Sequence, residues 1–564
     1  MHKRWILPDT DDTAVQELTD ALGISPVLCR LLVQRNIRTY EEAKLFFRPS
    51  LEHLHDPFLM QDMDVAVARL QRAIDNQEKV LLYGDYDVDG TTSVALMFEF
   101  LEKRLPNLDY YIPDRYKEGY GISFVSIEYA REHGVSLVIA MDCGIKAVEQ
   151  IALAATYNID FIVCDHHVPD QILPPAVAIL DPKRSDCAYP FKELSGCGIA
   201  FKLAQALLQS KGESVQGLEK LMDLLVLSIA CDLVSMRGEN RILAHHGLKR
   251  LNEDPRLGIR SLISVRGKEF PLTISDLVFG IGPLINAPGR LSDAKLAVRL
   301  LLASERSVAS DYAQLLVNQN TLRREVELEI MREAELMIAE NKADYDKTIV
   351  LFSPKWHKGV LGIIAARISE AHYRPTIVLT ESDGKIVGSA RTVRGFDVYK
   401  ALQQFEPLME SFGGHAFAAG LVMPIENLET FRAQFTAFGE TIMLPDHLIP
   451  EINISAILPL KAVTPTFYKI LRQFAPFGPD NMRPIFIAND VAEQGLARLS
   501  HNEQHLLLSV KVEDTHLVQG VGFNMGNLYN DLRNHTFDMC YVLDENTWKA
   551  DNSIRFQIKD LRIK

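Results

Sequence analysis

The sequence predicts a multidomain α/β protein: a parallel-sheet domain, a long connecting helix, a second α/β unit and a C-terminal β-barrel. Three observations lead to this prediction. Short, continuously apolar segments alternate with helical ones after about residue 75, which is typical of a doubly wound parallel sheet. Residues 305–341 form one charged helical stretch without a sustained heptad pattern. After about residue 451 the segments are short and β-rich, which is typical of a small barrel or sandwich.

The predicted domains follow one another along the chain. Residues 1–55 should form a small helical lead-in, since Thr39 and Glu42 have the spacing of a helix-capping box. The parallel-sheet domain spans residues 56–304, with strands at 79–83, 136–141 and 160–164, helices at 91–105 and 145–157, and a mostly helical part at 201–251. After the connecting helix, residues 342–445 form the second α/β unit, with strands at 348–352 and 376–379 and a helix at 359–371. Residues 446–564 form the barrel.

Length and composition limit the possible classes of function. A chain of 564 residues exceeds one hydrophobic core, and 47% apolar and 24% charged residues are ordinary for a globular protein. The net charge of −14 argues against a protein coated in basic residues but permits a local basic groove. The seven cysteines include no CxxC pair, so we expect a reduced, cytoplasmic chain. We expect neither a secretory signal nor a membrane span.

The strands of the first predicted sheet all end in acids or histidines. These residues are Asp85, Asp87 and Asp89; Asp142; and Asp165, His166 and His167. In open parallel sheets ligands bind at the carboxyl ends of the strands, so these side chains should meet at one edge. Such close carboxylates raise each other's pKa unless cations compensate them. Oxygen-rich ligands with imidazoles suit Mn²⁺ or Mg²⁺, and two such ions about 3.5–4 Å apart clamp a phosphate and activate a water.

A further acid and the alternative readings complete this hypothesis. Asp232 ends an apolar helical run and is a candidate ligand from a fourth segment. Taken alone, the Asp-x-Asp-x-Asp-Gly segment at residues 85–90 is equally consistent with a turn or a calcium-type loop, and a His-His pair is more often ordinary than a ligand pair. Acids or histidines at three successive strand ends are hard to explain as turns, so the joint pattern favours a two-metal site.

The chain resembles the DHH phosphoesterases at these positions. The segments 85–90 (DYDVDG), 141–144 (MDCG) and 165–167 (DHH) look like the first three motifs of that family, and Asp232 looks like the fourth. Residues 413–420 (GGHAFAAG) resemble the GGH motif of the DHH-associated domain, and residues 286–291 (NAPGRL) resemble the exonuclease branch. The resemblance implies a single-stranded-DNA-specific 5′→3′ exonuclease that releases 5′-mononucleotides in DNA repair and recombination, including mismatch repair.

The family also implies a role for each site residue. One ion would be held by Asp85, Asp87 and Asp142, although many members carry His at the position of Asp85. The second would be held by Asp89, Asp142, His166 and Asp232, with Asp142 bridging the two ions. His167 would face the scissile phosphate, and Asp165 would orient an imidazole, as a metal-bound histidine usually requires.

Phosphate recognition requires arginine, because its guanidinium is a rigid fork of donors. Arg115 lies in a Gly- and Tyr-rich loop after a strand, Arg290 follows a predicted Pro288-Gly289 turn, and Arg391 lies with Ser389 in a basic loop of small residues. Each alone is more often a surface or ion-pair residue, whereas the family resemblance implies that all three line the nucleic-acid path. His415 would contact a nucleotide; otherwise it belongs to a packed hairpin turn.

The β-rich end resembles an OB-type barrel, which holds single strands by aromatic stacking and a basic groove. Its aromatic candidates are Phe474, Phe477, Phe486 and Phe523, most of which we expect in the core. Two other functions compete: a DHH phosphodiesterase on short oligonucleotides, and a non-catalytic single-strand-binding scaffold. The retained acids argue against the scaffold. As partners the family implies single-stranded DNA, a single-stranded-DNA-binding protein and a helicase, and we expect a monomer.

Overall fold

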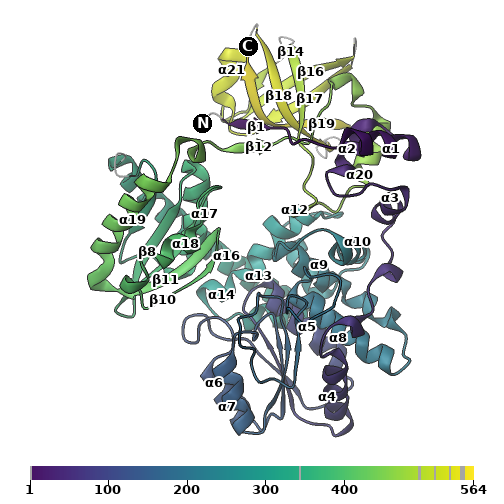
Figure 1. Cartoon of the computed structure of the whole chain (residues 1–564), viewed down its shortest axis with the longest axis vertical. Coiled ribbons are helices and arrows are strands. Elements are labelled where there is room, and N and C mark those ends of the chain that lie inside the picture. Colours follow the sequence, from purple (N-terminus) through teal and green to yellow (C-terminus); the bar gives the residue numbers. More distant parts are fainter. Residues whose placement is uncertain (1–2, 342–344, 493–496, 514–515, 533–534, 546–552) are drawn as a thin grey trace.

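The computed structural model of the chain describes residues 3–341, 345–492, 497–513, 516–532, 535–545 and 553–564. It has three main bodies (Figure 1): a large α/β domain, a second α/β domain beside it, and a β-rich domain near both chain ends. The long helix α16 (Arg306–Glu340) joins the first two bodies, within one residue of the predicted limits at each end. Among the described residues, no helix is long and apolar enough to cross a membrane.

The large domain is built on a five-stranded parallel sheet in the order β3-β2-β4-β5-β6. The three predicted strands are β2 (Val80–Gly84), β4 (Leu137–Met141) and β5 (Asp160–Cys164). They form because their continuous apolar runs are buried on both faces, as in parallel sheets generally. The strand expected before the Arg115 loop is β3 (Leu108–Tyr111), and the structure adds one strand that we did not predict, β6 (Ala178–Leu180).

Helices cover both faces of this sheet (Figure 1). One face bears α6 (Phe124–Glu132) and α7 (Val148–Thr156), which form a separate apolar core with it. The main core lies on the other face, whose helices are α4 (Met63–Asp75), α5 (Val88–Leu101), α8 (Gly196–Ser210), α9 (Met222–Cys231), α10 (Gly238–Glu253), α11 (Leu257–Val265) and α15 (Lys295–Leu301). The helix predicted at 91–105 is α5, which begins three residues earlier because Asp87 caps it by accepting from the N–H of Gly90.

The second α/β domain carries a mixed five-stranded sheet in the order β10-β11-β9-β8-β7. Its strands are β7 (Ile349–Phe352), β8 (Thr376–Ser382), β9 (Lys385–Arg391), β10 (Ser411–His415) and β11 (Ala418–Pro424). Only β7 and β8 are parallel, and the main helices are α17 (Leu361–His372) and α19 (Leu428–Ile442). The predicted basic loop around Ser389 and Arg391 was wrong, because both residues lie in β9, which pairs with β8 and β11.

The third body combines both ends of the chain. Its seven-stranded sheet has the order β13-β14-β18-β19-β17-β16-β15, and its longest strands are β18 (Thr536–Glu545) and β19 (Ile554–Ile563). The N-terminal helices α1 (Asp12–Leu22), α2 (Pro26–Val33) and α3 (Tyr40–Phe47) share its apolar core, and β1 (Arg4–Ile6) pairs with β12 (Glu451–Asn453). The helical segment predicted as a lead-in therefore packs as part of the C-terminal body. Phe474 and Phe486 are buried there, whereas Phe523 is 48% exposed.

Candidate metal centre and arginine pocket

The acidic strand ends meet at one edge of the parallel sheet, as predicted. Gly84 of β2 pairs with Met141 of β4, which pairs with Cys164 of β5, so the residues after these strands begin at the same level. Asp142 has a left-handed backbone with φ of 59°. The start of α8 approaches it so closely that a Cβ at Gly196 would lie 2.6 Å from the Cβ of Asp142. Glycine there lets α8 reach the site.

Six side chains form two neighbouring groups of three, which we call the metal cluster. The potential ligand atoms of Asp85, Asp87 and Asp142 lie within 4.8 Å of one another, and so do those of Asp89, His166 and Asp232. His166 Nε2 lies 3.2 Å from Asp142 Oδ1, 3.6 Å from Asp232 Oδ2 and 3.9 Å from Asp89 Oδ2. Asp142 therefore lies between the two groups.

The metal cluster is electrostatically unsatisfied. Asp85 Oδ1, Asp232 Oδ2 and both ring nitrogens of His166 are buried, and no hydrogen-bond partner is present for them among the described residues. Burial, and then the neighbouring carboxylates, raise the pKa of Asp85, Asp142 and Asp232 well above the ordinary value. Burial lowers the pKa of His166, which favours the neutral imidazole that metals bind. Carboxylates with one imidazole and unpartnered inward atoms fit divalent cations such as Mn²⁺ or Mg²⁺.

Asp89 is held in place by α8 and α9. Its carboxylate accepts the backbone N–H groups of Gly196 at 2.7 Å and Cys197 at 2.9 Å, both in the first turn of α8. It also accepts the hydroxyl of Ser228, in α9, at 2.6 Å. Fixing a ligand by hydrogen bonds behind it is the usual way that proteins orient metal ligands. Asp232 follows the last residue of α9, so the predicted fourth segment does reach the site.

Asp165 holds His167 beside the metal cluster. Asp165 Oδ1 lies 2.7 Å from His167 Nδ1, and Asp165 Oδ2 accepts the N–H of Ile145 at 2.9 Å. Burial opposes ionisation of Asp165, but these hydrogen bonds and the charge of His167 lower its pKa to about 2. Burial likewise opposes the charged form of His167, yet Asp165 raises the pKa of that ring. The Tyr120 hydroxyl, which we did not single out, lies 3.2 Å from His167 Nε2.

The sequence analysis also missed Asp181, which directly follows β6. Asp181 is fully buried, and its Oδ2 has no partner among the described residues. Burial raises its pKa to about 7. A three-residue strand gives too short an apolar run to recognise in a sequence, so this fourth strand end had no signal of its own.

The predicted phosphate-binding residues line one pocket of about 470 Å³ between the two α/β domains, which we call the arginine pocket. It contains Arg115 and Arg290 from the first domain, and Ser389 and Arg391 from the second. Burial and the charge of Arg115 lower the pKa of Arg290 to about 10 and also lower that of Arg391. Cations that destabilise one another in this way favour an anionic ligand.

Contacts place the arginine pocket next to the metal cluster. The Arg115 guanidinium lies 4.9 Å from the ring centroid of Tyr86, which stands between Asp85 and Asp87 in the sequence. Arg290 donates to the carbonyl of Gly359 across the domain boundary, at 3.2 Å. Arg391 donates to the Ser389 hydroxyl at 3.1 Å. Tyr116 and Lys358 also line the pocket and were missed, because nothing in their local sequence separates them from ordinary surface residues.

One prediction about this region needs correction. The Pro288-Gly289 turn is helical, since Arg290 lies in the short helix α14 (Pro288–Leu291). His415 is exposed at the end of β10 and does not line the arginine pocket, whereas its neighbours Gly413 and Gly414 do, so its contact with a nucleotide stays a prediction.

Comparison with known proteins agrees with this arrangement. Residues 79–229 match the DHH family N-terminal domain, residues 346–440 the DHHA1 domain and residues 454–560 the RecJ OB domain. The chain is 34% identical to the single-stranded-DNA-specific exonuclease RecJ of Bacillus subtilis, over 99% of this chain and 71% of that protein. It is 32% identical to RecJ of Salmonella typhimurium, over 95% of this chain and 96% of that protein.

A solved structure extends the likeness to the whole fold. RecJ from Thermus thermophilus, crystallised in complex with Mn²⁺, superposes with a TM-score of 0.85 at 27% identity, covering 99% of this chain and 79% of that one. The structure of the same protein with Mg²⁺ gives a TM-score of 0.79 at 26% identity, over 99% and 78% of the two chains. This chain belongs to the RecJ family. The predicted fold class, with an OB-type C-terminal domain, is confirmed.

Proposed function

We propose that this chain is a metal-dependent exonuclease that hydrolyses single-stranded DNA from the 5′ end and releases 5′-mononucleotides. The observation that carries the proposal is the adjacency of the metal cluster and the arginine pocket through Tyr86. The carboxylates of the metal cluster can hold cations, and the arginines of the adjacent pocket can bind a phosphate. Cleavage next to a terminal phosphate requires both. The relatives' names as single-stranded-DNA-specific exonucleases agree with it.

The polarity follows from the arginine pocket. Arg115, Arg290 and Arg391 converge on one space of limited size, which suits a terminal phosphate better than the middle of a strand. A 5′ phosphate held there would place the next phosphodiester toward Tyr86 and the metal cluster. The enzyme would then remove one nucleotide at a time, and a strand without a free 5′ end would be a poor substrate.

The metal cluster would hold two divalent cations, Mn²⁺ or Mg²⁺, with Asp142 between them. Bound there, the cations supply an activated water and neutralise charge on the phosphate. Asp89 keeps its ligand orientation because α8 and Ser228 hold its carboxylate. Asp165 raises the pKa of His167 and so favours its protonated form, in which this ring would donate to a phosphate oxygen beside the cluster and offer a proton to the leaving 3′ oxygen.

The cellular setting is proposed from the family resemblance. The enzyme would act in the cytoplasm as a monomer, on single strands that a helicase opens and a single-stranded-DNA-binding protein covers. The C-terminal body, which matches the RecJ OB domain, would hold the strand outside the active site. Repair and recombination, including mismatch repair, both need removal of such strands.

The competing functions make different use of the same residues. A phosphodiesterase of short oligonucleotides would need the metal cluster and the arginine pocket but not the C-terminal body. A non-catalytic scaffold would not need five clustered carboxylates, three of them buried, whose charges destabilise one another. The complete metal cluster therefore favours catalysis.

Digestion of end-labelled oligonucleotides tests the proposal. Purified protein is incubated with Mn²⁺ or with chelator, on single-stranded DNA, duplex DNA and single-stranded RNA labelled at either end. Immediate release of the 5′ label as mononucleotide from single-stranded DNA, lost with chelator, is expected. Release from the 3′ end first, or cleavage of only di- to tetranucleotides, would contradict the proposal, and binding without cleavage would favour the scaffold.

A further inference from the structure

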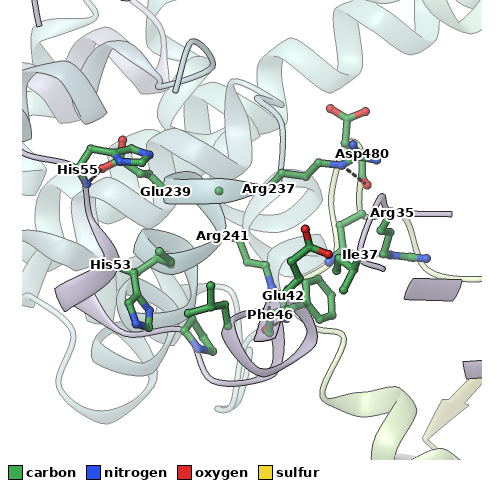
Figure 2. Close-up of a pocket in the computed structure, with 15 residues that line it drawn as sticks. Arg35, Ile37, Glu42, Phe46, His53, His55, Arg237, Glu239, Arg241 and Asp480 are labelled. Carbon is green, nitrogen blue, oxygen red and sulfur yellow. Dashed lines mark hydrogen bonds between the residues drawn. The ribbon is translucent and has the colours of Figure 1, made fainter. Parts of the chain in front are cut away.

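A separate cavity of about 300 Å³ lies where the N-terminal helices, the first turn of α10 and the loop before β14 (Phe486–Ala492) meet. We call it the junction cavity, and it shares no lining residue with the arginine pocket. Figure 2 shows Arg237 and Arg241 on the α10 side, Arg35 and Asp480 at one end, and His53 and His55 at the other. None of these residues has a role in the proposed nuclease chemistry.

Three arginines and three acids line the junction cavity, and among the described residues they form no ion pairs with one another. Arg35, Arg237 and Arg241 line it, and among the described residues none of their guanidinium groups forms an ion pair with a carboxylate. Arg241 is only 4% exposed. Burial and the neighbouring arginine lower the pKa of Arg35 to about 10 and that of Arg241 to about 9. Buried cations without counter-charges are costly, so proteins normally pair them or supply them with a ligand.

None of the three acids at the cavity has its carboxylate paired with Arg35, Arg237 or Arg241. Glu239 is paired with the buried Lys202, with 2.6 Å between Lys202 Nζ and Glu239 Oε1. Glu42 accepts from the backbone N–H groups of Arg38 and Thr39 at the start of α3. Asp480 accepts from Arg237 only through its backbone oxygen, at 3.1 Å (Figure 2).

Free donors point to where an anion would bind. All five N–H groups of Arg241 are used, since it donates to the carbonyls of Phe46, Gln473, Phe474 and Pro476. Among the described residues, Arg237 donates one hydrogen bond, from Nε to the backbone oxygen of Asp480, so the other N–H groups of its guanidinium are available to a ligand. Arg237 is also the residue before α10, a 16-residue helix with no side-chain cap, so the first N–H groups of that helix face the same region.

Part of the wall is apolar. Ile37, Leu45, Phe46 and Ile242 line the cavity, and the Arg241 guanidinium lies 3.9 Å from the ring centroid of Phe46. A cavity of this volume is large enough for a small organic ligand. The Arg237 guanidinium has donors available for an anionic group, and the apolar part of the wall can contact an apolar or aromatic body. A ligand that combines both parts therefore fits this cavity.

We propose that the junction cavity binds a small phosphorylated organic molecule of the nucleoside monophosphate class, with its phosphate on Arg237 and its base against the apolar wall. Because the walls come from the N-terminal helices, α10 and the loop before β14, the bound ligand would fasten the C-terminal body to the parallel-sheet domain. Ligand concentration would then bias the position of the barrel. This site is distinct from the arginine pocket and does not depend on nuclease activity.

The test uses full-length protein in chelator, with the Arg391→Ala substitution to weaken binding in the arginine pocket. Thermal unfolding and titration calorimetry are measured with 2′-deoxyadenosine 5′-monophosphate, with inorganic phosphate and with deoxyadenosine. The monophosphate should bind and raise Tm, with a rise that grows with the logarithm of its concentration above the dissociation constant. Phosphate should bind at least about tenfold more weakly and deoxyadenosine should not bind measurably, since each lacks one half of the recognised chemistry.

A matched pair of substitutions places the binding in the junction cavity. Leu45 lines it and is 48% exposed, so its replacement should not disturb folding. In the Arg391→Ala background, Leu45→Glu should weaken monophosphate binding at least about tenfold by charge repulsion, whereas Leu45→Gln should change it less than about twofold. Arg237→Gln should weaken it as Leu45→Glu does. Equal affinities for the Glu and Gln variants, or no binding to the Arg391→Ala protein, would overturn the proposal.

Discussion

The metal cluster and the arginine pocket are neighbours through Tyr86, but one domain builds the first and two domains build the second. The metal cluster uses strand ends of a single sheet and the end of α9, so its geometry is fixed as soon as that domain folds. The arginine pocket needs Arg115 and Arg290 from one domain and Arg391 from the other. Its geometry therefore depends on how the domains sit against each other.

This difference in construction separates the proposed role of the metal cluster, bond cleavage, from that of the arginine pocket, positioning of the substrate. Changes in the metal cluster should remove bond cleavage whatever the end of the substrate, whereas changes in the arginine pocket should affect mainly the recognition of the 5′ end. The sign of the charge also differs. Among the described residues, no Lys or Arg forms an ion pair with the carboxylates of the metal cluster, and no carboxylate forms one with the guanidinium groups of the arginine pocket.

The largest expected effect is that of Asp142→Ala. This carboxylate lies between both ligand groups, so its loss should lower the cleavage rate by more than about 10³-fold, on 5′-phosphorylated and 5′-hydroxyl substrates alike. The measurement is single-turnover digestion of labelled single-stranded DNA with Mn²⁺. The control is Asp64→Ala, an exposed acid in α4, which should leave the rate unchanged. A near wild-type rate for Asp142→Ala would rule out the two-ion assignment.

Arg391→Ala should have a smaller and more selective effect. Loss of a charge-assisted contact of about 1.5–3 kcal/mol corresponds to a fall of about 10- to 100-fold in kcat/KM. The fall should be confined to substrates with a 5′ phosphate. Steady-state kinetics on 5′-phosphorylated and 5′-hydroxyl strands check this. Arg394→Ala is the matched control, because Arg394 is 70% exposed and ion-paired with Glu451 outside the pocket. The same loss on both substrates would contradict 5′-phosphate recognition.

Gly359→Ala tests the domain boundary itself. An added Cβ would collide with the Tyr116 hydroxyl and the Arg290 carbonyl, so the two domains would have to separate slightly. We expect KM for 5′-phosphorylated DNA to rise about threefold to tenfold, while Mn²⁺ affinity, measured by calorimetry, stays unchanged. Gly384→Ala, at a turn of the same domain where φ is +73°, strains the backbone away from the boundary and is therefore a control for general destabilisation. Weakened Mn²⁺ binding in Gly359→Ala would show that the two sites are not separable.

The smallest effect concerns stability. In chelator the raised pKa values of Asp85, Asp142 and Asp232 mean that the folded state binds protons that the unfolded state has lost. Stability from these groups should therefore fall as pH rises from about 4 through their raised values. Mn²⁺ replaces those protons, so it should raise Tm by about 5 °C when saturating. The rise should be larger at pH 8 than at pH 6. A Tm rise independent of pH would be inconsistent with proton displacement from this cluster.

The strand ends could be predicted from the sequence because a buried parallel strand is a continuous apolar run, and an acid directly after it has few alternative explanations. The same reasoning gave no bounds for β3, whose side chains are mostly half-buried, and it missed β6, which has only three residues. Because β6 was missed, Asp181, which directly follows it, was missed as well. The acids that follow the central strands could thus be predicted, whereas the acid that follows the edge strand β6 could not.

The arginine pocket could be predicted only as residue types. Ser389 and Arg391 were expected in a loop because Gly388 and Ala390 have low strand preference, but pairing with β8 on one side and β11 on the other overrides that preference. Likewise, local sequence does not reveal that the N-terminal helices pack in the core of the C-terminal body, because that contact joins opposite ends of the chain. Both misses are long-range contacts, which leave no local pattern.

The most direct test of the central claim is to count the metal ions. Apo protein prepared with chelator is titrated with Mn²⁺, and binding is followed by calorimetry together with electron paramagnetic resonance of free Mn²⁺. Two ions per chain are expected for the wild type, and the closely spaced pair should be lost in Asp142→Ala, since that residue joins the two ligand groups. One ion per chain in the wild type, or two ions retained in Asp142→Ala, would contradict the claim that the acidic edge of the sheet is a two-metal centre.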